Sequence, residues 1–170
     1  QGKNIYTDNQ TGGIVWCTKG RYVAYVADTY CDDSDQSYDH VFDFGEAYEG
    51  RVASDIFVCD VEKLRNGEMD GVIEKVETLA QFVGDPQLYY DADSKLGVCY
   101  TAWKDEAKRL GLVYCPIRLS AIMTSTRVSN EKWSKPLCLS SSYRVAHTPR
   151  VSPTDCKVVF FASSNVPKTH

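Results

Sequence analysis

The sequence lacks the short motifs that mark several common catalytic sites. None of its eleven glycines brackets a serine as G-x-S-x-G, the turn that exposes the nucleophile of an α/β-hydrolase beside its oxyanion donors. No phosphate-cradling glycine loop is present either. Histidine is scarce, with only His40, His147 and His170. We therefore predict that this chain carries no catalytic residue and binds no cofactor.

Paired cysteine motifs are also absent. The seven cysteines include no C-x-x-C, which argues against a zinc knuckle and a thioredoxin-type motif. Cys59, Cys99 and Cys115 lie inside apolar strand patterns, where a free cysteine behaves as a small hydrophobic residue. This placement and the odd number favour a reducing compartment. A secreted disulfide domain is the alternative, and it predicts that denatured, unreduced protein has no free thiols.

Long hydrophobic runs and basic clusters are missing too. No apolar stretch approaches the roughly 20 residues of a membrane span. The 19 basic residues are scattered among 23 acidic ones, for a net charge of -4, so we expect neither a membrane nor a nucleic acid as partner. The acidic run 32–39 offers carboxylates but lacks the glycine and terminal glutamate of a calcium loop. We predict no metal site, and an inserted polar loop over 28–39.

Three stretches of the chain share one pattern, a short strand, a polar turn and a second β-branched or aromatic strand. Their strands are predicted at 13–16 and 22–26, at 86–90 and 96–100, and at 149–151 and 158–161. Such alternation around a turn is typical of β-hairpins. The hairpins recur about every 60 to 75 residues, which indicates propeller blades with inserted loops.

Strand patterns dominate the remaining sequence as well. Strands are expected at 56–61, 112–115, 121–123 and 137–139, and turn dipeptides stand at Asn66-Gly67 and Asp70-Gly71. The segment 72–83 fits either a strand pair or a short helix, and the blade context favours strands. The predicted fold class is all-β, a partial β-propeller of about three blades of antiparallel strands.

The length of 170 residues suits one domain but not a closed propeller, which has 4 to 8 blades. Gln1 is not an initiator residue, and no targeting leader precedes the first strand pattern. We therefore expect residues 1–170 to be part of the propeller of a larger protein.

Two polar features near the strands have alternative explanations. Glu106 and Arg109 form a pair that could line a channel or could fix a turn as a structural ion pair. His147 precedes the third hairpin and is expected to be a loop histidine rather than a general base. Trp103 is predicted to lie in a blade core, with a channel-lining role as the alternative.

Four motifs follow one another along the chain and go beyond generic hairpins. They are the opening stretch Gly2-Lys3 through Trp16 to Tyr25-Val26-Ala27; the element Phe42-Asp43-Phe44-Gly45-Glu46; the string Trp103, Glu106, Arg109-Leu110-Gly111, Cys115, Arg118, Ser120 and Ala121; and Pro149-Arg150-Val151-Ser152-Pro153 with Asp155-Cys156. In this order they resemble the N-terminal propeller of acylaminoacyl-peptidases, in the prolyl oligopeptidase family. The third string is the most specific. Phe44 replaces the usual tryptophan, and Ile117 stands where asparagine is common.

The resemblance implies a cytosolic serine exopeptidase that removes N-acylated residues from blocked peptides. In this family the catalytic residues lie in a C-terminal α/β-hydrolase domain, which is absent from this chain, and the propeller gates substrates by size. The implied partners are that hydrolase domain, an N-acylated peptide and, as a homo-oligomer, further copies of the protein. The alternative function is a non-enzymatic propeller that binds other proteins.

Overall fold

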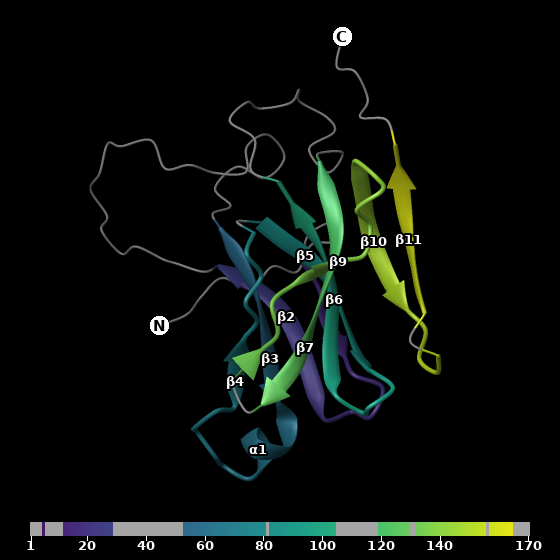
Figure 1. The fold of residues 1–170 in the computed structure, drawn as a ribbon. Helices are drawn as coiled ribbons and strands as arrows, with labels where there is room; N and C mark the ends of the chain where they lie inside the picture. Colours follow the sequence, from purple (N-terminus) through teal and green to yellow (C-terminus); the bar gives the residue numbers. More distant parts are fainter. Residues whose placement is uncertain are drawn as a thin grey trace, which may run out of the picture.

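The structure is a computed structural model of the 170-residue chain, and it describes residues 5, 12–28, 53–80, 82–104, 119–129, 132–155 and 157–164. Within these residues, antiparallel strands form three sheets, and one short helix, α1, lies at the lower end (Figure 1). Each sheet is built from strands that follow one another in the sequence, apart from α1 between β3 and β4.

Sheet 1 has the order β1 (Ile14–Trp16), β2 (Tyr22–Asp28), β3 (Ser54–Asp60) and β4 (Ile73–Lys75). Sheet 2 contains β5 (Phe82–Tyr90), β6 (Leu96–Trp103), β7 (Ser120–Ser129), β8 (Lys132–Trp133) and β9 (Leu137–Cys138), and both β8 and β9 pair with β7. Sheet 3 consists of β10 (Val145–Val151) and β11 (Val158–Ser163).

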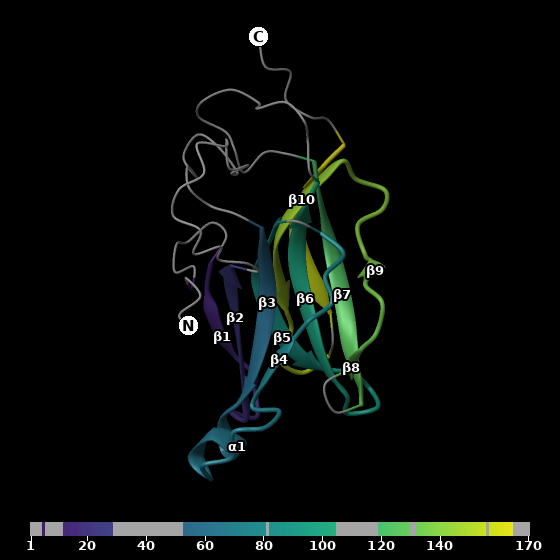
Figure 2. The same ribbon diagram turned by 90° about the vertical axis from the view of Figure 1, so that its left-hand side faces the viewer.

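The three sheets pack face to face in the order of the sequence (Figures 1 and 2). β2 and β3 contact β5, while β10 contacts β5, β6 and β7. The first strands begin at residues 14, 82 and 145, in agreement with the predicted hairpin spacing. Sequential antiparallel sheets that stack through their faces are the blades of a propeller. The predicted all-β, partial propeller is therefore confirmed, and the described residues do not close a ring.

All three predicted hairpins are present. Their strands pair in antiparallel register, with Val15 opposite Ala24, Leu88 opposite Val98, and Val151 opposite Val158. The first turn depends on Gly20, whose φ of 70° lies in the left-handed region that glycine adopts without steric cost. Local turn chemistry and alternating side chains are sufficient to specify this element, because both act within a few residues.

The main core lies between sheets 1 and 2. Its buried side chains are Cys17, Tyr22, Ala24, Val26, Ile56, Val58, Val76, Val83, Leu88, Leu96, Val98, Tyr100, Ala102 and Trp133. β6 is buried along its whole length, because one face packs in the main core through Val98 and Tyr100 and the other packs against sheet 3 at Cys99. At its end Trp103 is only 3% exposed, which confirms the predicted core position.

The first strands of sheets 2 and 3, β5 and β10, share an irregularity. The β5–β6 register shifts at Asp85-Pro86 and the β10–β11 register shifts at Thr148-Pro149, and the residue before each proline has a positive φ, 50° and 56°. Proline cannot donate to the strand ladder, so it is tolerated at such bulges. The hydroxyl of buried Thr101 links the two bulges: it donates to the Asp85 carboxylate at 3.4 Å and accepts from the Thr148 amide at 3.2 Å.

Several local expectations need correction. The turn region after β3 begins with α1 (Val61–Arg65), because the Asp60 carboxylate caps the amides of Glu62 and Lys63 at 3.1 and 3.3 Å. Asp28, predicted to open the inserted loop, is instead the buried last residue of β2, and residues 29–39 lie outside the described residues.

Two further expectations concern strands. The segment 72–83 contains β4 and the start of β5, as predicted, and its described residues form no helix. The strand predicted at 112–115 lies outside the described residues.

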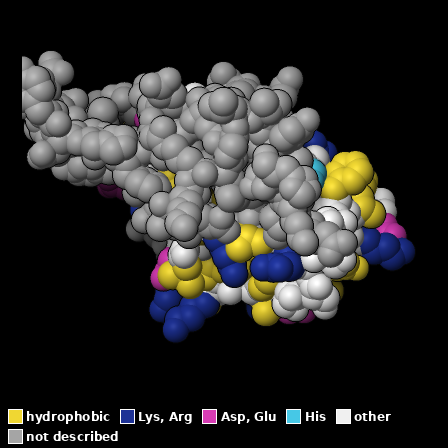
Figure 3. Space-filling view, turned by 90° about the horizontal axis from the view of Figure 1, so that it is seen from above, with side chains coloured by type: hydrophobic (Ala, Val, Ile, Leu, Met, Phe, Trp, Pro, Cys, Tyr) yellow, Lys and Arg dark blue, Asp and Glu magenta, His cyan; other side chains and the backbone are white. Residues whose placement is uncertain are grey.

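The outer face of sheet 3 carries exposed apolar side chains. Val159 and Phe161 are each 68% exposed, and Phe161 stacks on His147 with ring centroids 5.8 Å apart. Figure 3 shows hydrophobic side chains gathered on the right-hand side, where Figure 1 places β10 and β11. The opposite face packs on sheet 2 through Val151, Val158 and Phe160.

Candidate functional site

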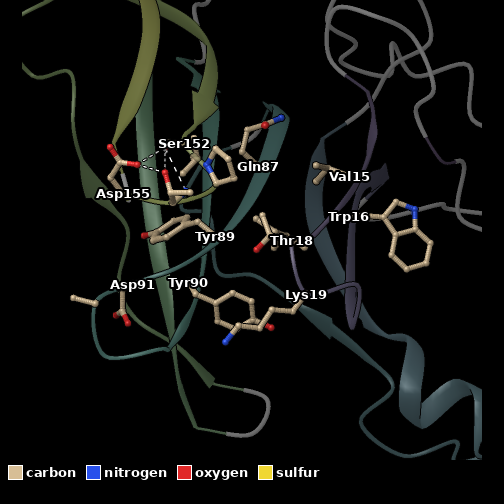
Figure 4. A pocket seen from close by; sticks show the side chains of 15 residues that line it. Val15, Trp16, Thr18, Lys19, Gln87, Tyr89, Tyr90, Asp91, Ser152 and Asp155 are labelled. Carbon is tan, nitrogen blue, oxygen red and sulfur yellow. Dashed lines mark hydrogen bonds between the residues drawn. The ribbon is translucent and has the colours of Figure 1, made fainter.

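A pocket of about 530 Å³ lies where the turns of the three hairpins converge (Figure 4). Each sheet contributes through its first strand or the turn that follows. The lining residues are Val15, Trp16, Thr18, Lys19, Gln87, Leu88, Tyr89, Tyr90, Asp91, Ala92, Val151, Ser152, Pro153, Thr154 and Asp155. Its size falls in the range of small-ligand sites, roughly 300 to 1,000 Å³. The same local element, repeated three times, therefore builds one concave surface.

The first turn is held by its own backbone and by Cys17. The Gly20 amide donates to the Cys17 carbonyl at 2.9 Å, and the Tyr22 amide donates to the Cys17 sulfur at 3.2 Å. This places Lys19 above the ring of Tyr90, with 4.1 Å between the ammonium nitrogen and the ring centroid. An ammonium group over an aromatic face is attracted by the ring quadrupole.

Tyr90 and Tyr89 side chains point to opposite faces of β5, as successive strand residues do. Burial, together with the nearby Cys17 thiol, raises the pKa of Tyr90 to about 12, so this phenol stays neutral at physiological pH. Tyr89 reaches across β6, and its hydroxyl forms a 2.6 Å hydrogen bond with the Thr124 hydroxyl. Gly97 makes this possible: a Cβ there would lie 2.3 Å from the Tyr89 ring.

The two carboxylates of the pocket are held by their own turns. Asp155 accepts from the Ser152 hydroxyl at 2.9 Å, from Lys157 at 2.8 Å and from the Thr154 hydroxyl. Lys157 foremost, and then the two hydroxyls, lower the pKa of Asp155. One oxygen of Asp91 accepts from the backbone amides of residues 93 and 95, at 3.0 and 2.8 Å. Both side chains thus act as turn-fixing acceptors.

The residues singled out from the sequence lie elsewhere. Glu106 and Arg109, with His40, His170 and the acidic run, fall outside the described residues. Trp103 is buried and does not line the pocket.

His147 was predicted to be a loop residue, and that is wrong. It belongs to β10, where its ring stacks on Phe161 and its Nδ1 lies 2.9 Å from the Thr148 hydroxyl. Burial lowers the pKa of His147.

The described residues contain no group of three or more histidine, cysteine, aspartate or glutamate side chains placed to hold a metal ion. Nor does any helix among them have the length and apolar character needed to cross a bilayer. Lys19, Tyr89 and Tyr90 were not predicted from the sequence to be site residues. Their position at the turn ends of two predicted hairpins was a usable signal, because turns of successive blades meet at one face of a propeller.

The stacked sheets, with a pocket at the turns of their first hairpins, define the chain as a partial β-propeller. Residues 31–168 match the family described as "Acylamino-acid-releasing enzyme, N-terminal domain". Because the match covers most of the sequence, this chain belongs to that family.

Two curated relatives agree with the assignment. The chain is 27% identical over 128 residues to acylamino-acid-releasing enzyme of Mus musculus, and 28% identical over 118 residues to that of Homo sapiens. These alignments cover 75% and 69% of this chain, but only 16% and 14% of the relatives. The chain thus spans a minor part of their length.

Proposed function

We propose that this chain is a segment of the propeller that covers the active site of a serine exopeptidase, an enzyme that releases N-acylated amino acids from blocked peptides. The observation that carries the proposal is the family membership of residues 31–168. The two relatives bear the name acylamino-acid-releasing enzyme, which supports the reaction in this proposal. In this proposal the reacting serine belongs to an α/β-hydrolase domain, which is the partner of the propeller within the complete protein.

The role proposed for the propeller is to gate substrates by size. The pocket of about 530 Å³ supports this role, because it is walled by turns from three successive sheets. Turns fixed by internal hydrogen bonds form rigid walls, which admit a short peptide and exclude a folded protein. A covered site also keeps bulk water from the reacting groups.

We also propose a cytoplasmic location. Cys17, Cys59, Cys99 and Cys138 are free thiols in the described part of the chain. Burial raises the pKa of Cys99 to about 12, so its thiol is unreactive. Titration of the denatured, unreduced protein should find most of the seven cysteines free. If the titration finds no free thiol, the result would support the alternative of a secreted domain held by disulfides.

A serine-directed fluorophosphonate tests the assignment of the chemistry. The 170-residue chain alone should remain unlabelled, whereas a full-length protein that contains this segment and a hydrolase domain should be labelled at one serine. Stoichiometric labelling of the chain alone would contradict the proposal. An unreactive full-length protein would support the non-enzymatic scaffold instead.

Size selection is tested on the same full-length protein with N-acetylated peptides of increasing length and with a folded N-acetylated protein. Turnover of short peptides with no turnover of the folded protein is the expected result. Equal rates on short peptides and on the folded protein would exclude gating.

A further inference from the structure

Lys19 is a charged group of the pocket that no acidic residue in the described part of the chain compensates. Its ammonium lies 4.1 Å from the centre of the Tyr90 ring, and it makes no ion pair with any other described residue. By contrast, Arg21 in the same turn is tied to the Asp60 carboxylate at 2.8 Å. Within the first turn, Arg21 is therefore paired with a carboxylate, whereas Lys19 has no acidic partner among the described residues.

The carboxylates that line the pocket do not neutralise Lys19. Asp155 is already paired with Lys157, and an oxygen of Asp91 is used by two backbone amides. Figure 4 shows Lys19 lying along the Tyr90 ring, and no ion pair joins Lys19 to Asp91. The uncompensated charge at this side of the pocket is positive, and it stands over an aromatic surface.

We propose that Lys19 binds the carboxylate of an N-acylated amino acid or short N-acylated peptide, and that the Tyr90 ring contacts the apolar part of the same ligand. This inference rests on the proposed function and adds a specificity residue to it. Acylation removes the α-ammonium, so a ligand with no ionisable side chain carries one charge, its carboxylate. The charge of the ligand and the free charge of the pocket are complementary.

The contact between Lys19 and a ligand carboxylate is expected to raise the binding affinity by a modest but measurable amount. A hydrogen bond between an ammonium and a carboxylate is stronger than a neutral one, although solvent at an exposed lysine reduces its contribution. The Tyr90 ring orients the ammonium without neutralising it. We expect the charge contact to change affinity roughly tenfold.

Calorimetric titration of the 170-residue chain tests the inference with defined probes. The probes are N-acetyl-phenylalanine, its uncharged C-terminal amide, and the cationic unblocked phenylalanine amide. The acid should bind roughly tenfold more tightly than N-acetyl-phenylalanine amide. Its affinity should fall as salt is raised, because salt screens exposed charges. The cationic amide should bind most weakly.

Variants then assign the effect to Lys19. Lys19→Met keeps the aliphatic stem and removes the charge, so the acid should lose its advantage over the amide, whereas Lys19→Arg should retain it. Lys95→Met is the matched control: Lys95 lies in the second turn, is exposed and does not line the pocket. That variant should bind like the unmodified chain, and circular dichroism should show the same fold in all of them.

Three results would overturn the inference: equal affinity for acid and amide, unchanged preference in Lys19→Met, or no binding of any probe. None of these outcomes bears on the fluorophosphonate and peptide-length experiments. If Lys19→Met leaves the preference for the acid unchanged and size selection is still observed, only the proposed carboxylate contact is refuted. If Lys19→Met abolishes the preference but short peptides and the folded protein react equally fast, the gating is refuted and Lys19 is still a ligand-binding residue.

Discussion

The two interfaces between neighbouring sheets are built differently. Sheets 1 and 2 enclose large side chains, among them Tyr22, Tyr100 and Trp133, all less than 10% exposed. Sheets 2 and 3 meet at the small buried group Cys99, Ile122 and Ala146, with half-buried Tyr89 and Phe160 beside it. Burial of apolar surface is the dominant favourable term in folding. The first interface therefore holds the stable part of the molecule, and sheet 3 is attached by less apolar contact.

The polar contacts also differ between the two interfaces. Between sheets 1 and 2, Arg127 of β7 forms an ion pair with Glu74 of β4 and donates to the Tyr22 hydroxyl at 3.0 Å. Between sheets 2 and 3, single hydrogen bonds connect the backbone to hydroxyls, such as the Ala146 amide to Ser120 at 3.2 Å. A buried ion pair specifies one arrangement of two sheets, because either charge is costly to bury alone.

Tyr100→Ala should have the largest effect, since Tyr100 is fully buried in the first interface and its hydroxyl donates to the Thr78 carbonyl at 3.3 Å. We expect a loss of about 3–5 kcal/mol in the free energy of unfolding, measured by urea denaturation. Tyr100→Phe should lose only about 1 kcal/mol, the hydrogen bond. Phe160→Ala, in the second interface, should lose at most about 2 kcal/mol. A larger loss for Phe160→Ala would reverse the ranking of the two interfaces.

Arg127→Met should be next, with a loss of about 3 kcal/mol, because it leaves the Glu74 carboxylate buried without its partner. The matched control is the double variant Arg127→Met with Glu74→Gln, which removes both charges. It should be more stable than the single variant. If thermal unfolding shows the double variant to be the less stable, the ion pair is not what holds sheets 1 and 2 together.

Gly97→Ala tests the second interface. The added Cβ would lie 2.3 Å from the Tyr89 ring and displace it from Thr124. We expect a loss of about 1–3 kcal/mol. Native-state hydrogen exchange should become faster in β10 and β11, while β2 and β3 keep their protection. Uniform loss of protection in all three sheets would show that the interfaces unfold as one unit.

Asp60→Asn should have the smallest effect, because Asp60 lies at the end of sheet 1 and outside both interfaces. Burial alone would raise the pKa of Asp60, but hydrogen bonds from Arg21 and the α1 amides outweigh it and lower the pKa. The folded pKa is below the unfolded one, so the stabilisation is present above about pH 4 and is lost as the pH falls further. We expect a loss of about 1 kcal/mol at pH 7. Urea denaturation curves of Asp60→Asn and the unmodified chain should approach each other as the pH falls below about 4.

The hairpins could be predicted from the sequence because their signals are local. The strands on either side of Gly20 pair through residues only a few positions apart, and the turn residues set that pairing. α1 was missed although Asp60 is a favourable N-cap, because five residues give little helical periodicity to detect. The Lys19–Tyr90 contact could not be predicted, because it joins the first turn to the end of β5, which lie far apart in the sequence and meet only when the sheets stack.

The sequence by itself determined the antiparallel strands, their turns and the family, since alternation, turn residues and short motifs act over a few positions. Only the tertiary structure decided which turns share a pocket, that Arg127 meets Glu74, and that Tyr89 lies over Gly97. Those contacts depend on how whole sheets pack, and packing is set by the fit of many side chains at once.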